Sequence, residues 1–445
     1  MRKKIFAPVI IISILISILY VEYVRNAMAS QDDNIYTNLK TFAQVLKLVQ
    51  EGYVEEKSSS DLIEGAIKGL LVNLDAHSSY MNKDSFKEMQ VDTEGEFGGL
   101  GIEITMKKGI LTVVTPIDDT PADRAGVMAG DKILAVDGDH TTDMTLTDAV
   151  KKLRGKPNTK VVITVYRDGE EKTRDITIIR EIIKVQSTKS GMIDDGIAYI
   201  RLINFNKNIS GEMITAIEDF KKKGEFKGLI LDLRNNPGGL LDQAVKVSEA
   251  FLDNGQLVVY TKGRVQKQNM EFKSRNSKPY KDFPIVVLVN QGSASASEIV
   301  AGALQDTNRA IILGEQTFGK GSVQTVIPLN DGSAIRLTTS RYYTPAGQVI
   351  QENGITPDIF VKRIFPKETP EEKDRKVIRE KDLKNILKAK DSNGKTFEKK
   401  KTKKGVDYDK VLEKLRLKKN DNQLQSATQL LKGWEVFQKV SKSTK

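Results

Sequence analysis

The sequence contains no cysteine and only two histidines, His77 and His140, among its 445 residues. The absence of cysteine excludes a catalytic thiol, disulfide bonds and thiolate metal sites, and so few histidines argue against a zinc centre. We therefore expect neither a metal nor a cofactor. A serine nucleophile in this chain would also have to work with a base other than imidazole, unless one of these two histidines lies beside it.

The composition is that of a folded, multidomain chain. Hydrophobic residues make up 39% and charged residues 29% of the sequence, and its length predicts two to four domains. The formal net charge is +11, but the lysines concentrate after Lys362. We interpret this excess as a solvated tail with weak attraction for a membrane surface, and we expect no nucleic acid partner.

The first 29 residues have the pattern of an export signal. A basic start at residues 1–4 precedes an apolar run from Ile5 to Val21, and Ala-Met-Ala at residues 27–29 fits a cleavage site. The run is at the short end for a membrane span, which favours a cleaved signal peptide over an uncleaved anchor. In either case the sequence predicts an exported protein that contacts the membrane only through this segment.

The most informative stretch runs from Asn290 to Gln324. A short β-branched run at 284–289 predicts a buried strand, small residues then make a turn, and 296–304 has the composition of a helix. A strand that turns into a helix N-terminus leaves free N–H groups and a positive dipole end at one place. A serine in that turn, such as Ser295, would lie beside donors able to stabilise an oxyanion.

Lys320, which lies between Gly319 and Gly321, is the candidate base. A lysine can act as a base when burial lowers its pKa enough to keep it neutral. If residues 320–326 form a strand, Lys320 and Gln324 share one face by the period of two. Gln324 could then accept a hydrogen bond from Lys320 or donate one to it.

Two other interpretations of this stretch need no peptidase chemistry. Ser295 and Glu298 have the spacing of a capping box, in which both side chains only satisfy donors at a helix end. The segment from Gly314 to Lys320 matches most of a nucleotide-binding P-loop, but Gly321 stands where that motif needs Ser or Thr. Neither alternative accounts for both halves of the stretch.

Residues 290–298 and 317–324 together resemble the signature of the carboxyl-terminal processing (tail-specific) serine proteases. The resemblance implies that Ser295 is the nucleophile, that Lys320 is the base and that Gln324 orients Lys320. It extends from about residue 35 to residue 358. It also includes a Leu-Asp-x-His-Ser motif at residues 74–78, in which Ala76 replaces the family's usual proline and His77 has a structural role.

From residue 94 to about residue 180 the pattern changes to short alternating strands. The glycine-rich loop at residues 97–104 and the motifs at residues 121–126 and 130–138 resemble those of a PDZ domain. In such domains consecutive amides of a glycine-rich loop converge on a chain-terminal carboxylate, and the next strand pairs with the peptide. Residues 147–153 predict the helix that lines the groove. Arg154 follows this helix and is either a surface charge or a regulatory contact to the protease core. The loop residues implied to bind peptide are Gly98, Gly99, Leu100, Gly101 and Ile102.

From Gly196 onward, strands alternate with helices, which predicts crossover connections and a mainly parallel sheet. An Asn-Asn-Pro-Gly-Gly loop at residues 235–239 follows one of these strands. The resemblance implies one oxyanion donor from Gly238 or Gly239, which the sequence does not separate, and a second from Ala296. A glycine-rich turn without a catalytic role is the alternative for this loop.

These observations predict a multidomain α+β protein, in which an α/β protease core of the crotonase or ClpP type carries an inserted PDZ domain between helical terminal regions. The expected segments are 1–29, a signal peptide or anchor; 30–90, helical; 91–181, PDZ; 182–362, protease core; and 363–445, a charged linker and helical region.

The expected function is that of an exported serine endopeptidase, in the bacterial periplasm or at the outer face of the inner membrane. It would cleave proteins at or near exposed or unfolded C-terminal tails, with the PDZ domain recognising tails or gating the site. We also expect a homo-oligomer, and an adaptor protein is a possible further partner. The competing functions are a PDZ scaffold with an inactive protease-like domain and a nucleotide-binding protein.

Overall fold

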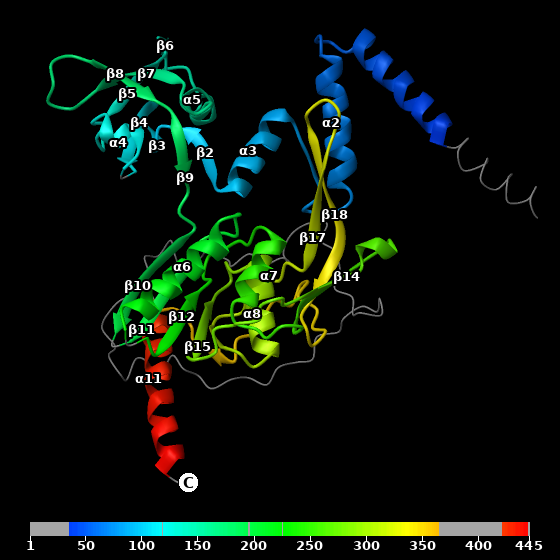
Figure 1. Ribbon diagram of the computed structural model, residues 1–445. Helices are drawn as coiled ribbons and strands as arrows, with labels where there is room; N and C mark the ends of the chain where they lie inside the picture. The colour runs from blue at the N-terminus through cyan, green and yellow to red at the C-terminus, as the bar shows by residue number, and fades with distance from the viewer. Residues whose placement is uncertain (1–34, 118, 195, 225, 365–420, 444–445) are drawn as a thin grey trace, which may run out of the picture. The chain divides into compact units, whose positions relative to one another are not determined.

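The computed structural model describes residues 35–364 and 421–443, apart from residues 118, 195 and 225 (Figure 1). The predicted export signal and most of the predicted charged linker lie outside the described residues. The chain divides into two compact units, residues 1–74 and 75–445, which we describe separately.

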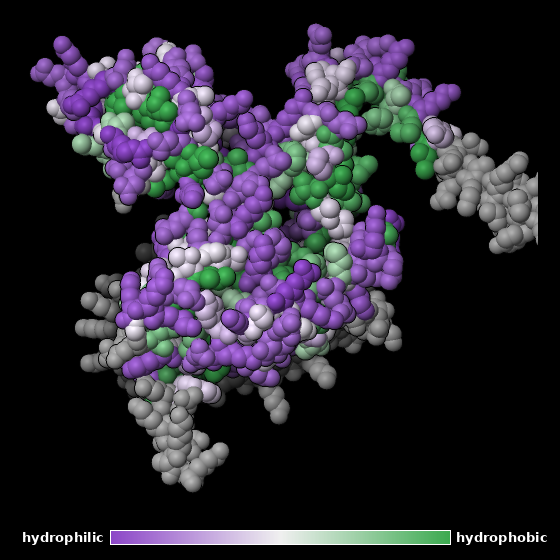
Figure 2. Space-filling view, viewed as in Figure 1, coloured by the Kyte–Doolittle hydropathy of each residue, from purple (hydrophilic) through white to green (hydrophobic). Residues whose placement is uncertain are grey.

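The described part of the first unit is helical. Residues 35–52 form one helix, and α2 (Ser59–Val72) begins at Ser58, whose hydroxyl accepts a hydrogen bond from the N–H of Asp61 at 3.2 Å. Large apolar side chains stay exposed on these helices, including Phe42 and Leu70, and Figure 2 shows the hydrophobic surface that they form. None of the helices in the described part of the chain is both long enough and apolar enough to span a membrane.

A small β-rich domain follows helix α3 (Lys83–Glu94). Its main sheet has the order β3-β4-β5-β7-β8, so that β3 lies at an open edge. Helix α5 begins with a capping box between Thr145 and Asp148 and buries Ala149 and Leu153 in the apolar core. The elements are β2 (Glu96–Gly99), β3 (Ile102–Lys107), β4 (Ile110–Pro116), α4 (Pro121–Arg124), β5 (Lys132–Val136), β6 (Asp139–His140), α5 (Leu146–Leu153), β7 (Lys160–Tyr166), β8 (Arg174–Ile179) and β9 (Glu181–Lys184).

The largest apolar core surrounds a six-stranded sheet with the order β10-β11-β12-β15-β16-β19. Its strands are parallel except β10, as the alternation of strands and helices predicts. The elements are β10 (Thr188–Asp194), β11 (Ile197–Leu202), α6 (Ile209–Lys222), β12 (Gly228–Asp232), α7 (Leu241–Glu249), β15 (Ile285–Val289), α8 (Ala296–Asp306), β16 (Ile311–Gly314), β19 (Ile359–Phe360) and α11 (Asn422–Ser443).

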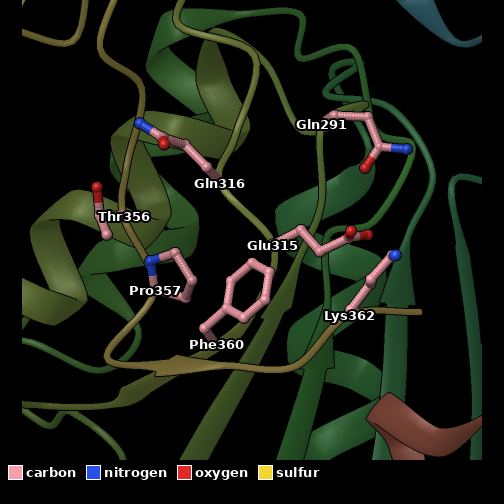
Figure 3. Close-up of a pocket in the computed structure, with 7 residues that line it drawn as sticks. All are labelled: Gln291, Glu315, Gln316, Thr356, Pro357, Phe360 and Lys362. Atoms are coloured by element: carbon pink, nitrogen blue, oxygen red, sulfur yellow. The ribbon is translucent and has the colours of Figure 1, made fainter. Parts of the chain in front are cut away.

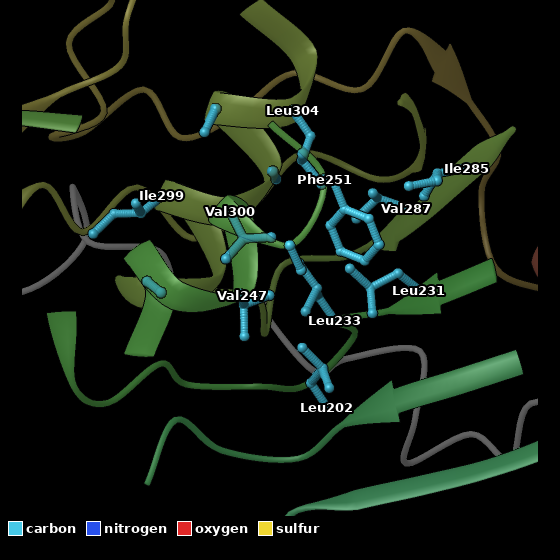
Figure 4. Packing of buried hydrophobic residues seen from close by; sticks show 14 of the residues in the cluster. Leu202, Leu231, Leu233, Val247, Phe251, Ile285, Val287, Ile299, Val300 and Leu304 are labelled. Carbon is cyan, nitrogen blue, oxygen red and sulfur yellow. The ribbon is translucent and has the colours of Figure 1, made fainter. Parts of the chain in front are cut away.

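Both faces of this sheet are covered, which explains its continuous apolar strands. Leu231 and Val287 belong to the core shared with α6, α7 and α8, part of which Figure 4 shows. The neighbouring residues Ile230 and Val286 point to the other face, where they pack against Leu431 of α11. The apolar side of α11 therefore packs on the chain's own sheet.

A second sheet has the order β1-β18-β13-β14, and β17 pairs with β18. It includes β1 (Ser79–Met81), β13 (Leu257–Gly263), β14 (Met270–Lys273), β17 (Ser322–Pro328) and β18 (Ala334–Tyr343), with a 3-10 turn at Gln266–Gln268. Strand β17 begins at Ser322 and has a bulge between Val323 and Gln324. The expected strand from residue 320 was therefore wrong at its start, and the period of two does not place Lys320 and Gln324 on one face.

Candidate active site

Ser295 lies in the turn between β15 and α8. Its φ is 55° and its ψ −114°, a backbone conformation that non-glycine residues rarely adopt outside functional sites. The hydroxyl of Ser293 fixes the turn, since it accepts from the N–H of Asn290 at 3.0 Å and donates to the carbonyl of Leu233 at 2.8 Å. These buried bonds hold Ser295 at the N-terminus of α8.

The loop at residues 235–239 lies against this turn. The carbonyl of Asn236 accepts hydrogen bonds from the N–H of Ala294 at 3.0 Å and from the hydroxyl of Ser297 at 2.9 Å. A Cβ atom on Gly238 would lie only 2.7 Å from the Cβ of Ser295. Only a glycine therefore lets the loop approach the serine this closely.

The two loop glycines differ in what their amides do. The N–H of Gly238 donates to Oδ1 of Asn236 at 2.9 Å. Within the part of the chain that the structure describes, the N–H groups of Gly239 and Ala296 donate to no protein acceptor. These two amides remain available to a ligand in the cleft.

Glu298 connects α8 to the loop that carries Lys320. Its side chain is completely buried, and its Oε2 accepts from the N–H of Ser295 at 2.8 Å and from the N–H of Lys320 at 2.9 Å. Its Oε1 accepts from the hydroxyl of Thr317 at 2.6 Å and from the N–H of Gly319 at 2.8 Å. Burial raises the pKa of Glu298 to about 7, although these four hydrogen bonds oppose the increase.

The predicted nucleophile, base and orienting residue line one cleft of about 870 Å³, together with Gly238, Gly239 and Ala296. Gln324 comes from β17, where its Nε2 donates to the hydroxyls of Ser322 at 2.9 Å and Thr338 at 3.2 Å. The cleft walls also carry apolar side chains, among them Ile299 and Phe272. The structure thus brings all six residues predicted for the catalytic chemistry to one place.

The two competing interpretations of this stretch fit the geometry poorly. The Glu298 half of the capping box is formed, but the same carboxylate also binds three groups of the loop at residues 317–320, which capping does not require. The segment from Gly314 to Lys320 leads into strand β17, whereas a P-loop needs a helix whose N-terminus faces the phosphates. The nucleotide-binding interpretation is therefore wrong for this segment.

A smaller hollow of about 280 Å³ lies elsewhere on the core, beside Glu315, Phe360 and Lys362 (Figure 3). Neither Ser295 nor Lys320 lines it. It is therefore separate from the cleft in which the predicted catalytic residues meet.

The β-rich domain has its own groove of about 80 Å³ between β3 and α5. Gly99, Leu100, Gly101 and Ile102 line it, as predicted. Gly98 does not line it; its carbonyl accepts from the N–H of Gly155 at 3.0 Å, beyond the end of α5.

Arg154 also lines the groove of the β-rich domain. Its guanidinium carbon lies 4.3 Å from the ring centre of Phe97, a cation–π contact at the groove wall. The predicted regulatory residue therefore contacts the same groove as the residues predicted to bind peptide.

Sequence reasoning missed a buried ion cluster directly before the glycine loop. Arg234 is 5% exposed and forms ion pairs with Asp232 at 2.6 Å and with Asp421 at 2.7 Å. Burial would lower the pKa of Arg234, but the hydrogen bonds and charges of both carboxylates raise it overall. Because Asp421 directly precedes α11, the cluster ties the C-terminal helix to the strand that leads into the loop. Nothing in the sequence pairs residues this far apart.

No cluster of three or more histidine, aspartate or glutamate side chains that could hold a metal ion occurs in the described part of the chain. The cleft that Ser295 lines contains the amine-bearing side chain of Lys320, and the carboxylate of Glu298 accepts from the N–H of Ser295. Such a set can carry out nucleophilic chemistry with a neutral amine as base.

Comparison with known proteins gives three family matches that follow each other along the chain. Residues 18–85 match the activating protease CtpB N-terminal domain, residues 98–178 match the PDZ domain, and residues 196–361 match peptidase family S41.

Full-length relatives agree with these matches. The chain is 46% identical to a carboxy-terminal-processing protease of Bartonella bacilliformis over 368 residues, 82% of this chain and 84% of the relative. It is 37% identical to a probable CtpA-like serine protease of Staphylococcus aureus, over 79% of this chain and 70% of the relative. A solved photosystem II D1 C-terminal processing protease aligns with 31% identity and a TM-score of 0.42, over 72% of this chain and 92% of that one.

The fold and these relatives define a serine-type peptidase that carries a PDZ domain. The chain belongs to peptidase family S41, among the carboxy-terminal-processing proteases. The predicted family, the mixed α/β core with a PDZ domain and the peptidase activity are thereby confirmed.

Proposed function

We propose that the protein is a serine endopeptidase in which Ser295 and Lys320 form a catalytic dyad. Neutral Lys320 takes the proton from the Ser295 hydroxyl, and the oxygen attacks the carbonyl carbon of a substrate peptide bond. The lysine then gives that proton to the leaving amine. Water, deprotonated by the same lysine, hydrolyses the resulting ester and restores the serine.

The amides of Gly239 and Ala296 are the proposed oxyanion donors. The N–H of Gly238 is engaged by Asn236, which favours Gly239 between the two loop glycines. Ala296 provides the first N–H of α8, so that the helix dipole adds to its effect. One such donor lowers the reaction barrier by about 2.7–4 kcal/mol.

The observation that carries this proposal is the shared carboxylate oxygen of Glu298, which accepts from the backbone N–H groups of both Ser295 and Lys320. Two residues that are 25 positions apart are thereby held by one buried atom. A scaffold that only bound peptide tails would gain nothing from coupling a serine to a lysine in this way.

The test is hydrolysis of an unfolded protein with an apolar C-terminus by the full-length chain. We expect wild-type activity to rise with pH through the titration of the lysine and to disappear in both Ser295→Ala and Lys320→Ala. Ser277→Ala and Lys278→Ala change the same residue types at exposed positions and should keep full activity. Cleavage that persists in Ser295→Ala would identify a different nucleophile, and a silent wild type that still binds the tail would favour the scaffold.

We propose that substrates are proteins with exposed C-terminal tails and that the PDZ domain captures these tails. Strand β3 lies at the sheet edge and can pair with an added strand, and the amides of the loop at residues 99–102 begin the same groove. Binding of a peptide with a free C-terminal carboxylate, compared with its C-terminal amide, tests this step. Equal affinity for the two peptides would contradict it.

We also propose that the protein is exported, on the basis of the basic and apolar start of the sequence. A fusion of residues 1–29 to a reporter that is active only outside the cytoplasm should be active. A fusion in which two arginines replace central residues of the apolar run should not.

A further inference from the structure

A buried carboxylate, Asp75, belongs to a hydrogen-bonded chain that ends in the active-site cleft. Asp75 is 5% exposed, and its Oδ1 accepts from the N–H groups of His77 at 2.7 Å and Ser78 at 2.8 Å. Its Oδ2 accepts from the hydroxyl of Ser78 at 2.8 Å. Burial alone would raise the pKa of Asp75, but these hydrogen bonds lower it overall, so that Asp75 is an ionised group that can only accept.

Thr338 of β18 is the next member of the chain. Its hydroxyl donates to Oδ1 of Asp75 at 3.1 Å, and its N–H donates to the hydroxyl of Ser78 at 3.1 Å. A threonine hydroxyl has one proton and two lone pairs. Because its proton goes to Asp75, the oxygen of Thr338 can only accept from any other partner.

The other partner is Gln324, which pairs with Thr338 across strands β17 and β18. The Nε2 of Gln324 donates to the Thr338 hydroxyl at 3.2 Å and to the Ser322 hydroxyl at 2.9 Å. Because Nε2 makes both contacts, the other end of the amide, the carbonyl oxygen Oε1, can face the cleft. Lys320 lines the same cleft.

We propose that Asp75 is a positioning residue for the catalytic base, because through Thr338 it fixes which end of the Gln324 amide meets Lys320. In this arrangement Oε1 of Gln324 accepts an N–H of Lys320, and the nitrogen lone pair stays directed at Ser295. In the opposite orientation an N–H of Gln324 would bind that lone pair and compete with the serine proton. The inference rests on the dyad proposed above and extends it to a motif 245 residues before the lysine.

The experiment measures kcat and its pH profile for full-length variants that break the chain at different members. Thr338→Val has a similar shape, changes no charge and removes one of the two acceptors of the Gln324 amide, leaving the Ser322 hydroxyl. We expect kcat to fall about tenfold, the scale of one lost hydrogen bond to a polar group. The acid limb should also move to lower pH, because an acceptor at the nitrogen favours the protonated lysine and that acceptor is no longer held. Thr338→Ser keeps the hydroxyl and should restore both properties.

Asp75→Asn should change kcat and the acid limb in the same direction, with a smaller effect because its Oδ1 can still accept from Thr338. The matched control is Asp331→Asn in the β17–β18 hairpin, where Asp331 accepts from the N–H of Ser333 at 3.0 Å and from its hydroxyl at 2.6 Å. This change removes the same charge from a similar turn and should leave kcat and the pH profile unchanged. The other charged side chains that line the cleft, Asp92, Asp242 and Arg336, are the same in all these variants.

A positioning role and a purely structural role are separated in the Gln324→Ala background. If Asp75 acts through Gln324, Asp75→Asn has no further effect on kcat or on the acid limb in that background, although it still lowers the melting temperature. An equal loss of kcat in both backgrounds, or an unchanged pH profile in Thr338→Val, would overturn the inference. The proposed dyad is judged separately, by whether Ser295→Ala abolishes cleavage.

Discussion

The backbone N–H of Lys320 and the backbone N–H of Ser295 donate to the same oxygen, Oε2 of Glu298, at 2.9 and 2.8 Å. The other oxygen of this carboxylate accepts from Thr317 and Gly319. A completely buried side chain thus receives four hydrogen bonds from donors alone, and the relative position of serine and lysine depends on all of them.

We therefore predict that Glu298→Gln is far more harmful than an isosteric change usually is. The new NH2 group must face two donors, and each buried donor left unpaired costs about 1–3 kcal/mol. Above pH 7, where Glu298 is ionised, the free energy of unfolding should fall by about 2–4 kcal/mol and kcat at least about tenfold, measured by urea unfolding and by hydrolysis of an unfolded protein.

The control for Glu298→Gln is Glu271→Gln, in which an exposed glutamate of β14 loses its 2.8 Å ion pair with Lys273. This variant should stay within about 0.5 kcal/mol of the wild type. Equal losses in the two variants would mean that the four bonds of Glu298 have no special effect.

A second prediction concerns stability against pH. Burial raises the pKa of Glu298 from its ordinary value of 4.5 to about 7. Between pH 4.5 and about pH 7, Glu298 is protonated in the folded state but ionised in the unfolded chain. The folded state therefore loses stability relative to the unfolded chain as pH rises. The free energy of unfolding should therefore fall from about pH 4.5 to about pH 7, by about 3 kcal/mol in total.

Urea unfolding at stepwise pH measures this slope. Glu298→Gln cannot titrate, so its profile should be flatter than that of the wild type over the same interval. A wild-type slope that persists unchanged in Glu298→Gln would assign the proton to another group.

The third prediction asks why residue 239 has to be glycine: because a neighbouring backbone lies too close for a Cβ atom, or because its φ is positive. Gly239 has a φ of +146°, and a Cβ atom there would lie 2.4 Å from the carbonyl oxygen of Phe205. Gly239→Ala should displace the loop and lower kcat by about 10²–10³, the loss expected for one oxyanion donor. In the control Gly255→Ala, φ is also positive at +86° but nothing lies within 4 Å. That variant should lose about 1–2 kcal/mol of stability with kcat unchanged.

The fourth prediction tests the link between the C-terminal helix and the loop. Asp421→Ala removes two charge-assisted hydrogen bonds from the buried guanidinium of Arg234, both at 2.7 Å. We expect the free energy of unfolding to fall by about 2–3 kcal/mol and kcat to fall with it, because Arg234 precedes the loop directly. Asp282→Ala, at an 81% exposed side chain with a 3.8 Å ion pair, should change neither. Full activity in Asp421→Ala would mean that the active site does not depend on the contact between Arg234 and the C-terminal helix.

The sequence was sufficient to predict the residues that meet in the cleft. Their residue types pointed to Ser295 and Lys320, and the resemblance to the tail-specific proteases implied Gln324, the loop glycines and Ala296. The partners that hold these residues could not be predicted in the same way. Thr338 binds Asp75 across 263 positions, and Arg234 binds Asp421 across 187, and both contacts exist only after the sheets have formed. Glu298 was visible in the motif, but its three bonds to residues 317–320 depend on where that loop folds back.

The start of β17 was predicted wrongly for a related reason. Alternation of side chains suggested a strand from Lys320, but the N–H of Lys320 donates to Glu298 and the N–H of Gly321 donates to Gln351. With these two amides bound by side chains, the ladder with β18 begins only at Ser322. The departure from regular structure therefore occurs at the predicted catalytic base itself.

The ion pair between Arg234 and Asp421 also fixes an order of events during synthesis. Ribosomes add residues from the N-terminus, so that the dyad residues and the glycine loop are all made before Asp421 exists. Until Asp421 has been made, Arg234 lacks this second carboxylate partner, and the sheet face on which α11 packs is without that helix. Asp421 and α11 are thus translated after the dyad residues and the glycine loop, so that a growing chain contains the proposed catalytic residues before it contains the contacts that support them.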